Sequence, residues 1–191
     1  MTKKMLKSLR EWVFMIVGAV VVFLLLNQFV VFTCVVPSGS MIPTIQLQDR
    51  LVVDRLFYKM GSLERGDIIV FEAPEKQALA DMKGQRLVKR LIGLPGETIE
   101  VKDGSVWIDG QELNEPYVSL MGGPSFGPEP VPEGSYFVMG DNRPGSNDSR
   151  FWGFLDQKLV EGRAWVRYWP FDRLGTLVKP PEDYLRGNGI S

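Results

Sequence analysis

Two serines separated by one glycine, Ser38 and Ser40, follow directly on an apolar N-terminal segment in a chain of 191 residues that contains no histidine. A serine nucleophile needs a base that takes its proton, so the absence of an imidazole excludes a Ser-His-Asp triad. The remaining common base is a lysine that burial in an apolar pocket keeps neutral. Lys89 is the best candidate, because it lies in the apolar and β-branched run LVKRLIG at 87–93.

The run around Lys89 is expected to be a β-strand, in which successive side chains point to opposite faces. Lys89 then shares a face with Leu87 and Leu91, whereas Arg90 points to the other face with Val88. The two serines are two residues apart and would likewise share a face of an extended stretch. The pattern therefore predicts that Lys89 faces the chemistry and that Arg90 faces a structural partner.

Composition narrows the possible cofactors and partners. Residues 1–11 hold four of the 22 basic residues and one of the 23 acidic ones, which leaves the rest of the chain with a net charge of −4. That balance argues against nucleic-acid binding. The single cysteine, Cys34, excludes an intrachain disulfide and, without histidine, a zinc site of the usual ligands. Carboxylates alone could hold calcium or magnesium, but no EF-hand spacing occurs, and we expect no cofactor.

An uncleaved membrane anchor is predicted for residues 12–36, in which apolar residues predominate. As a helix this segment would be about 37 Å long, enough for one tilted span of a hydrocarbon core of roughly 30 Å. A cleaved signal peptide also begins with basic residues, but its apolar region is shorter and a small-residue cleavage site follows it. Because basic flanks stay in the cytoplasm, residues 1–11 should be cytoplasmic and residues 37–191 should form an extracytoplasmic domain.

Beyond the anchor the pattern turns to short strands. The Asp-Gly pair at 103–104, between runs at 98–101 and 105–108, is a strong hairpin signal. Proline- and glycine-bearing stretches at 73–84 and 122–134 are expected to be loops. No stretch of useful length with helical periodicity follows the anchor. The predicted fold is a mainly β, antiparallel domain on one N-terminal transmembrane helix, with further strands at 50–54, 67–71, 136–139 and 164–169.

Four motifs, in order, resemble those of type I signal peptidases. PSGSMIPT at 37–44 resembles their serine box, and RGDIIVF at 65–71 resembles the strand that follows it. RLVKRLIGLPGE at 86–97 resembles their lysine box. Their C-terminal box is matched by GDNR at 140–143 and SNDSRFWG at 146–153. Each motif alone is weak, but all four in order behind a basic-flanked apolar segment are specific.

The resemblance implies roles for four side chains. Ser40 matches the nucleophile that forms the acyl-enzyme, and Lys89 matches its general base. Ser146 matches the serine that hydrogen-bonds to that lysine and orients it. Ser38 matches a hydroxyl donor of the oxyanion hole, beside the backbone N–H of Ser40.

The resemblance also implies structural ion pairs and a substrate preference. Asp148 should pair with Arg150, and Asp141 with Arg90. The residues PG at 144–145 depart from the polar residues that the family more often has, which should change the backbone of that loop. The family prefers small residues, usually alanine, at the minus-one and minus-three positions of the substrate. The pockets that receive them would be lined near Val36, Pro37, Met41, Leu87 and Val88.

The function implied by the resemblance is that of a membrane-anchored serine endopeptidase that removes signal peptides from exported preproteins. Its expected partners are these preproteins, the lipid bilayer and a nearby secretion translocon, in a bacterial cytoplasmic membrane. One alternative is a Ser/Lys autoprotease of the repressor-cleavage kind, but such proteins are soluble and carry a DNA-binding module. Another is a non-catalytic, membrane-tethered β module that binds exported chains, which the joint presence of the three serines and the lysine opposes.

Overall fold

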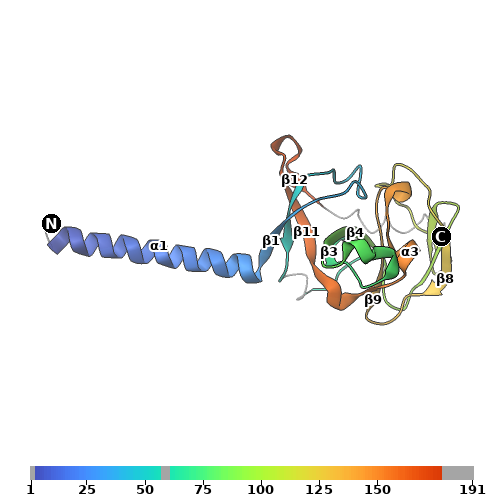
Figure 1. Ribbon diagram of the computed structural model, residues 1–191, viewed down its shortest axis with the longest axis horizontal. Coiled ribbons are helices and arrows are strands. Elements are labelled where there is room, and N and C mark those ends of the chain that lie inside the picture. Colours follow the sequence, from blue (N-terminus) through green and yellow to red (C-terminus); the bar gives the residue numbers. More distant parts are fainter. Residues whose placement is uncertain (1–2, 57–60, 178–191) are drawn as a thin grey trace, which may run out of the picture.

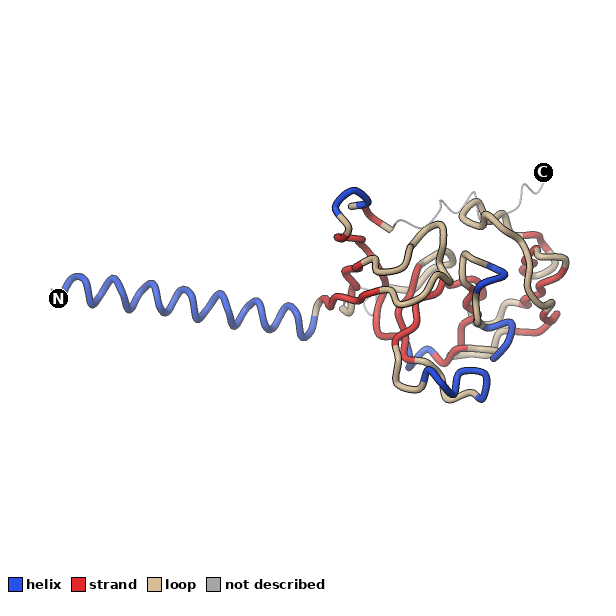
Figure 2. Tube along the Cα trace, turned by 45° about the horizontal axis from the view of Figure 1, so that its top comes forward, coloured by secondary structure: helices blue, strands red, loops and turns tan. Residues whose placement is uncertain are grey.

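The structure, a computed structural model, describes residues 3–56 and 61–177. Figure 1 shows a long N-terminal helix that projects away from a body built mostly of strands. Figure 2, turned by 45°, shows the same division, with only short helical segments among the strands and loops of the body. Every strand pairing in the described residues is antiparallel. The predicted mainly β, antiparallel fold class is therefore confirmed.

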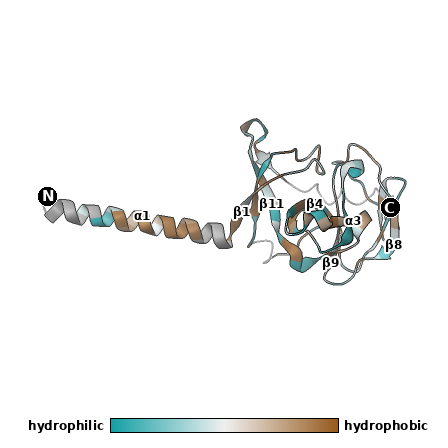
Figure 3. Cartoon of the chain, viewed as in Figure 1, coloured by the Kyte–Doolittle hydropathy of each residue, from teal (hydrophilic) through white to brown (hydrophobic). Residues whose placement is uncertain are grey.

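Helix α1 spans Lys3–Phe29 and is 27 residues long. Its middle consists of large apolar side chains that are open to the surroundings, from Val21 at 48% exposed to Phe14 at 81% (Figure 3). In the described part of the chain, no helix is both long enough and apolar enough to cross a membrane. The side chains at 1–7, which include most of the basic flank used to predict topology, lie outside the described part. The anchor at 12–36 stays a prediction.

The C-terminal end of the predicted anchor segment is a strand rather than part of a helix. α1 ends at Phe29, and β1 at Val31–Val35 pairs with β2 at Arg50–Asp54. The sequence VFTCV is apolar and β-branched, so its hydropathy suits a membrane span and a strand equally. Hydrogen bonding to β2 and the burial of Cys34 and Val36 favour the strand. This part of the segment therefore belongs to the body.

Within residues 3–56 and 61–177, the larger sheet has eight strands. Besides β1 and β2 they are β3 (Ile68–Glu72), β4 (Arg86–Gly93), β9 (Ser135–Met139), β10 (Leu155–Asp156), β11 (Val160–Trp169) and β12 (Gly175–Thr176). The order is β1-β2-β11-β3-β4-β9-β10, with β12 paired to β11. Because β4 lies between β3 and β9, Lys89 and Arg90 sit in the interior of the sheet and not at an edge.

The smaller sheet has four strands in the order β7-β6-β5-β8. They are β5 (Thr98–Lys102), β6 (Ser105–Ile108), β7 (Gln111–Glu112) and β8 (Phe126–Pro130). The predicted hairpin is confirmed, because Asp103 and Gly104 join β5 to β6 with the positive φ values that a tight two-residue turn needs. The prediction of a loop at 122–134 is wrong in part, because β8 lies within it. Its prolines are tolerated since β8 is an edge strand.

The helical segments of the body are short. The longest, η1 at Gln77–Met82, has six residues and lies inside the stretch 73–84 that we expected to be a loop. Its Leu79 is 2% exposed and inserts into an apolar cluster, which gives that stretch a fixed place. The others are η2 (Arg143–Gly145), α3 (Ser149–Trp152), η3 (Gln157–Leu159) and η4 (Phe171–Arg173).

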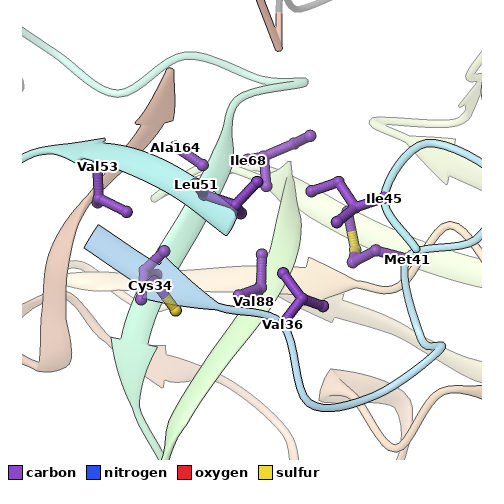
Figure 4. Close-up of a cluster of buried hydrophobic side chains, with 10 residues drawn as sticks. Cys34, Val36, Met41, Ile45, Leu51, Val53, Ile68, Val88 and Ala164 are labelled. Carbon is purple, nitrogen blue, oxygen red and sulfur yellow. The ribbon is translucent and has the colours of Figure 1, made fainter. Parts of the chain in front are cut away.

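Two apolar clusters position the motifs. The first, shown in Figure 4, brings Val36 and Val88 of β4 against Met41, the residue after Ser40. The second joins the two sheets, because Ile92 of β4 and Phe137 of β9 pack with residues of β5 and β6. Leu91, on the opposite face of β4, belongs to the cluster that also contains Leu79. The lysine strand therefore has apolar packing on both faces, which restricts its movement.

Candidate active site

The serine and the lysine that the sequence singles out are in contact. Lys89 Nζ donates a hydrogen bond to Ser40 Oγ at 2.6 Å. β4 supplies Lys89 from the sheet interior, and a turn 49 residues earlier supplies Ser40. Only 6% of Ser40 and 3% of Lys89 is exposed. The fold thus holds a candidate nucleophile and a candidate base within hydrogen-bonding distance, both largely buried.

Burial changes the acid–base behaviour of Lys89. Desolvation lowers the pKa of its ammonium group from 10.5 to about 8, because the charged form loses its hydration in the interior. The carboxylates of Asp148 and Asp141 oppose this change in pKa, and the Arg150 guanidinium adds to it. A lysine with this pKa is partly neutral near neutral pH, as a general base must be.

The turn that carries Ser40 is held by the C-terminal motif. The backbone N–H of Asn142 donates to the Ser40 carbonyl at 3.0 Å. The side-chain amide of Asn142 donates to the Gly39 carbonyl at 3.1 Å. The hydroxyl of Thr44, near the end of the same turn, donates a hydrogen bond to Asp141 Oδ2. Segments about a hundred residues apart in sequence are thus joined directly around the nucleophile.

Ser38 lies beside the nucleophile, but on a different backbone from the one expected. Residues 38–44 form bends and turns, so the expectation that the two serines share a face of an extended stretch is wrong. Their hydroxyl oxygens nevertheless lie 3.3 Å apart. Ser38 as a residue is exposed, whereas Ser40 is buried. The oxyanion-hole role of Ser38 stays a prediction.

Ser146 reaches the site without making the predicted hydrogen bond to Lys89. Its hydroxyl is buried and has no hydrogen-bond partner among the described residues, so that expectation is wrong for this structure. η2 immediately precedes Ser146 and turns its hydroxyl toward Gly140. A Cβ atom at Gly140 would lie 2.4 Å from both Ser146 Oγ and the Ser40 carbonyl oxygen. Only glycine permits so close an approach of the two segments.

Both predicted ion pairs are present and buried. Arg90 donates from Nε and Nη2 to the two oxygens of Asp141, at 2.8 and 2.6 Å. Arg150 contacts both oxygens of Asp148 in the same way, at 2.8 and 2.9 Å. Asp148 also accepts the backbone N–H of Gly140 at 3.0 Å. Two-pronged contacts of this kind fix orientation as well as distance, so the pairs shape the loops around the dyad.

Sequence reasoning missed a third buried ion pair, between Glu115 and Arg143. Arg143 Nη1 donates to Glu115 Oε2 at 2.8 Å, and Nη2 contacts the other oxygen. Each side chain is only 1% exposed. Glu115 lies in the segment NEPY at 114–117, outside the four motifs. Its neighbours resemble an ordinary polar turn, and no spacing rule connects it to Arg143, so the sequence alone offered no signal.

A groove of about 610 Å³ runs beside β1 and the beginning of β4. Of the five residues predicted to bind substrate, Pro37 lines this groove. Val36, Met41 and Val88 are packed in the first apolar cluster, and Leu87 packs against a third cluster built around Leu91 and Trp152. The groove also carries charge, because Arg86 and Glu161 form an ion pair in its wall at 2.9 Å.

Comparison with known proteins agrees with these motifs. Residues 9–169 match the family model described as signal peptidase, peptidase S26. Signal peptidase I of Leptolyngbya laminosa is 45% identical over 165 residues, which cover 85% of this chain and 81% of that protein. Signal peptidase I of Bacillus licheniformis is 41% identical over 180 residues, covering 87% of this chain and 92% of that protein.

One solved structure is also similar, a crystal structure of a signal peptidase I from Enterococcus faecalis. It is 41% identical, covers 54% of this chain and 97% of its own, and superimposes with a TM-score of 0.46. The family match spans most of the chain and includes all four motifs. From this match and the identities to its relatives, the chain belongs to the signal peptidase family, peptidase S26.

Proposed function

We propose that this chain is a signal peptidase I, a serine endopeptidase that cleaves signal peptides from exported preproteins, with Ser40 as nucleophile and Lys89 as general base. The observation that carries the proposal is the 2.6 Å hydrogen bond from Lys89 Nζ to Ser40 Oγ in a chain without histidine. Relatives named signal peptidase I align along most of the chain. They support this function over a repressor-type autoprotease or a non-catalytic binding module.

The chemistry follows from the protonation state of Lys89. Its neutral amine accepts the Ser40 proton while Oγ attacks the scissile carbonyl carbon. When the tetrahedral intermediate collapses, the C–N bond breaks and the leaving amine takes the proton from Lys89 Nζ. A water molecule, deprotonated by the same amine, then attacks the ester carbonyl carbon. The bond from this carbon to Ser40 Oγ breaks, and Oγ takes the proton back from Lys89 Nζ. The Ser38 hydroxyl, 3.3 Å from Ser40 Oγ, and the Ser40 backbone N–H donate hydrogen bonds to the oxyanion.

We propose that the preprotein binds as an extended chain in the groove beside β1 and β4. Pro37 lines this groove and immediately precedes the serine turn in the chain. Val36, Met41 and Val88 are packed in the first apolar cluster and do not line the groove, and Leu87 lies beside Val88 in β4. These four residues flank Ser40 and Lys89 in the chain, and their close packing would reject large substrate side chains by steric clash, which favours small residues at the minus-one and minus-three positions.

We also propose that α1 anchors the chain in a bacterial cytoplasmic membrane, with residues 1–11 inside and the body outside. The support for this proposal is the run of large apolar side chains that α1 leaves exposed between Trp12 and Leu24. β1 begins two residues after α1 ends, so the body stays close to the membrane. The partners are then the bilayer and the preprotein leaving the translocon, whose own apolar segment delivers the scissile bond to the site.

Cleavage of a preprotein tests the proposed function. The purified full chain in detergent should cut at the end of the signal peptide, and Ser40→Ala and Lys89→Arg should each lower kcat by roughly 10³-fold or more. Arginine stays protonated at any working pH and cannot act as the base. Lys83→Arg, at an exposed lysine paired with Glu75, is the matched control and should leave kcat unchanged. Near-normal turnover by Lys89→Arg would show that another group is the base.

The pH profile should report the pKa of Lys89. Below pH about 8 the lysine is protonated in the free enzyme, so kcat/KM should fall by about tenfold per pH unit and should level off above that value. The measurement uses a substrate without ionisable residues near the scissile bond, so that only the enzyme titrates. A rate that stays maximal down to pH 6 would contradict a lysine base.

Substitution of Gly140 should disrupt the site without touching either member of the dyad. Gly140→Ala places a methyl group 2.4 Å from Ser146 Oγ and the Ser40 carbonyl, so it should displace the nucleophile and lower kcat by about 10²-fold. Gly175→Ala is the control, because its Cβ would meet nothing closer than 4.0 Å. Full activity of Gly140→Ala would show that the two segments are not held this closely.

The anchor can be tested by extraction from membranes. The full chain produced in bacterial cells should remain in the membrane pellet after washing at high pH, because α1 buries its apolar side chains in lipid. A chain that begins at residue 30 keeps β1 and should be released. Release of the full chain, or retention of the shortened one, would show that α1 is not the anchor.

A further inference from the structure

Glu115 is a buried carboxylate that belongs to none of the four motifs. It lies after the end of β7, and the residue as a whole, backbone included, is 7% exposed. Both of its oxygens are engaged, by the two terminal nitrogens of Arg143. The phenolic hydroxyl of Tyr117 donates a hydrogen bond to Glu115 Oε1 at 2.8 Å. A buried carboxylate whose two oxygens are both hydrogen-bonded is held in one orientation.

One branch of contacts leads from Glu115 to the nucleophile. Arg143, which Glu115 holds, donates from Nε to the carbonyl of Gly140 at 3.1 Å. Gly140 packs directly on the Ser40 carbonyl and on Ser146. Asn142, one residue before Arg143, accounts for the hydrogen bonds to the backbone of the serine turn. The guanidinium therefore fixes the segment on which Ser40 rests.

A second branch leads from Glu115 to the base. The Tyr117 ring lies beneath the guanidinium of Arg90, whose central carbon is 3.9 Å from the ring centre. Arg90 follows Lys89 in β4 and is held on its other side by Asp141. Burial raises the pKa of Tyr117 well above 10.0, so its hydroxyl keeps the proton that it donates to Glu115. Glu115 is therefore connected to Ser40 by one branch of contacts and to Lys89 by the other.

We propose that Glu115, with Tyr117, is a positioning residue for the Ser40–Lys89 pair and acts through Arg143 and Arg90. The segment that follows β7 then does more than connect strands, since it supplies the anchor point for both halves of the site. A buried ion pair adds little net stability over an apolar pair of similar shape, which leaves orientation as its principal contribution. This inference rests on the proposed function, because its effect is measured on preprotein cleavage.

The test compares Glu115→Gln with wild type in full-length protein in detergent, at a temperature well below both melting points. The amide keeps the shape of the side chain but leaves the charge of Arg143 without its partner. We expect kcat to fall by about tenfold or more while KM stays within about twofold, because alignment of the dyad is lost and the substrate groove is untouched. Tyr117→Phe removes one hydroxyl and keeps the ring under Arg90, so it should show the same pattern to a smaller extent.

A stability control separates positioning from general loosening of the fold. Val106→Ala truncates a fully buried side chain of β6 in the cluster that joins the sheets. It should lower Tm and leave kcat within about twofold of wild type. The inference is overturned if Glu115→Gln keeps normal kcat, if it raises KM alone, or if Val106→Ala loses as much kcat for the same fall in Tm. If Glu115→Gln does not fold, the kcat of Tyr117→Phe decides by the same criteria.

The same experiment distinguishes failure of this inference from failure of the proposed function. Wild-type protein that cleaves the preprotein, beside an inactive Ser40→Ala variant, upholds the proposed function whatever Glu115→Gln does. Wild-type protein that does not cleave contradicts the proposed function. In that case the pKa of Lys89 can be titrated directly in wild type and in Glu115→Gln. If Glu115 holds the dyad in place, its replacement changes the surroundings of Lys89 and so its pKa. An unchanged pKa overturns the inference.

Discussion

The burial of Lys89 is the constraint on which the rest of this structure depends. Lowering the pKa of its ammonium group from 10.5 to about 8 corresponds to about 3 kcal/mol against the charged form in the folded state. Between these two pH values the unfolded chain still holds a proton that the folded chain has released, so stability rises with pH across that window. At and below pH 8 the folded protein carries the cost of a buried charge, which other interactions must offset. Loss of stability at a reactive group is a common consequence of activity.

The carboxylates of Asp148 and Asp141 favour the charged form of Lys89 and offset part of this cost, and the fold holds the surroundings of Lys89 in place. β4 is hydrogen-bonded on both edges, to β3 and β9, and the side chains of both its faces enter apolar clusters. Three arginine–carboxylate pairs, each nearly inaccessible to water, surround the site and pin the loops that meet there. Gly140 then allows the Ser40 and Ser146 segments to approach more closely than any side chain would permit. The dyad is thus positioned by contacts from almost every part of the body.

The sequence predicted the contact between Ser40 and Lys89 better than the interactions that support it. Without histidine, Ser40 and Lys89 were the natural pair, and alternation in β4 placed Lys89 and Arg90 on opposite faces. Local patterns also located the hairpin at 103–104, because an Asp-Gly turn is decided by its own two residues. The strand at Val31–Val35 was misjudged, since hydropathy does not distinguish an apolar strand from the end of a span. The orientation of Ser146 and the pairing of Glu115 with Arg143 were out of reach, because both depend on tertiary contacts between distant segments.

A direct titration of Lys89 tests the central claim most sharply. Lysine labelled with ¹³C at Cε can be followed by NMR in the full-length protein, with the Lys89 signal assigned by its absence from a Lys89→Met variant. The Cε shift should change with a midpoint near pH 8, while exposed lysines such as Lys83 titrate above 10. A midpoint for Lys89 at or above 10.5 would show that the ammonium group remains charged at working pH, and it would contradict a mechanism in which this lysine takes the proton of Ser40.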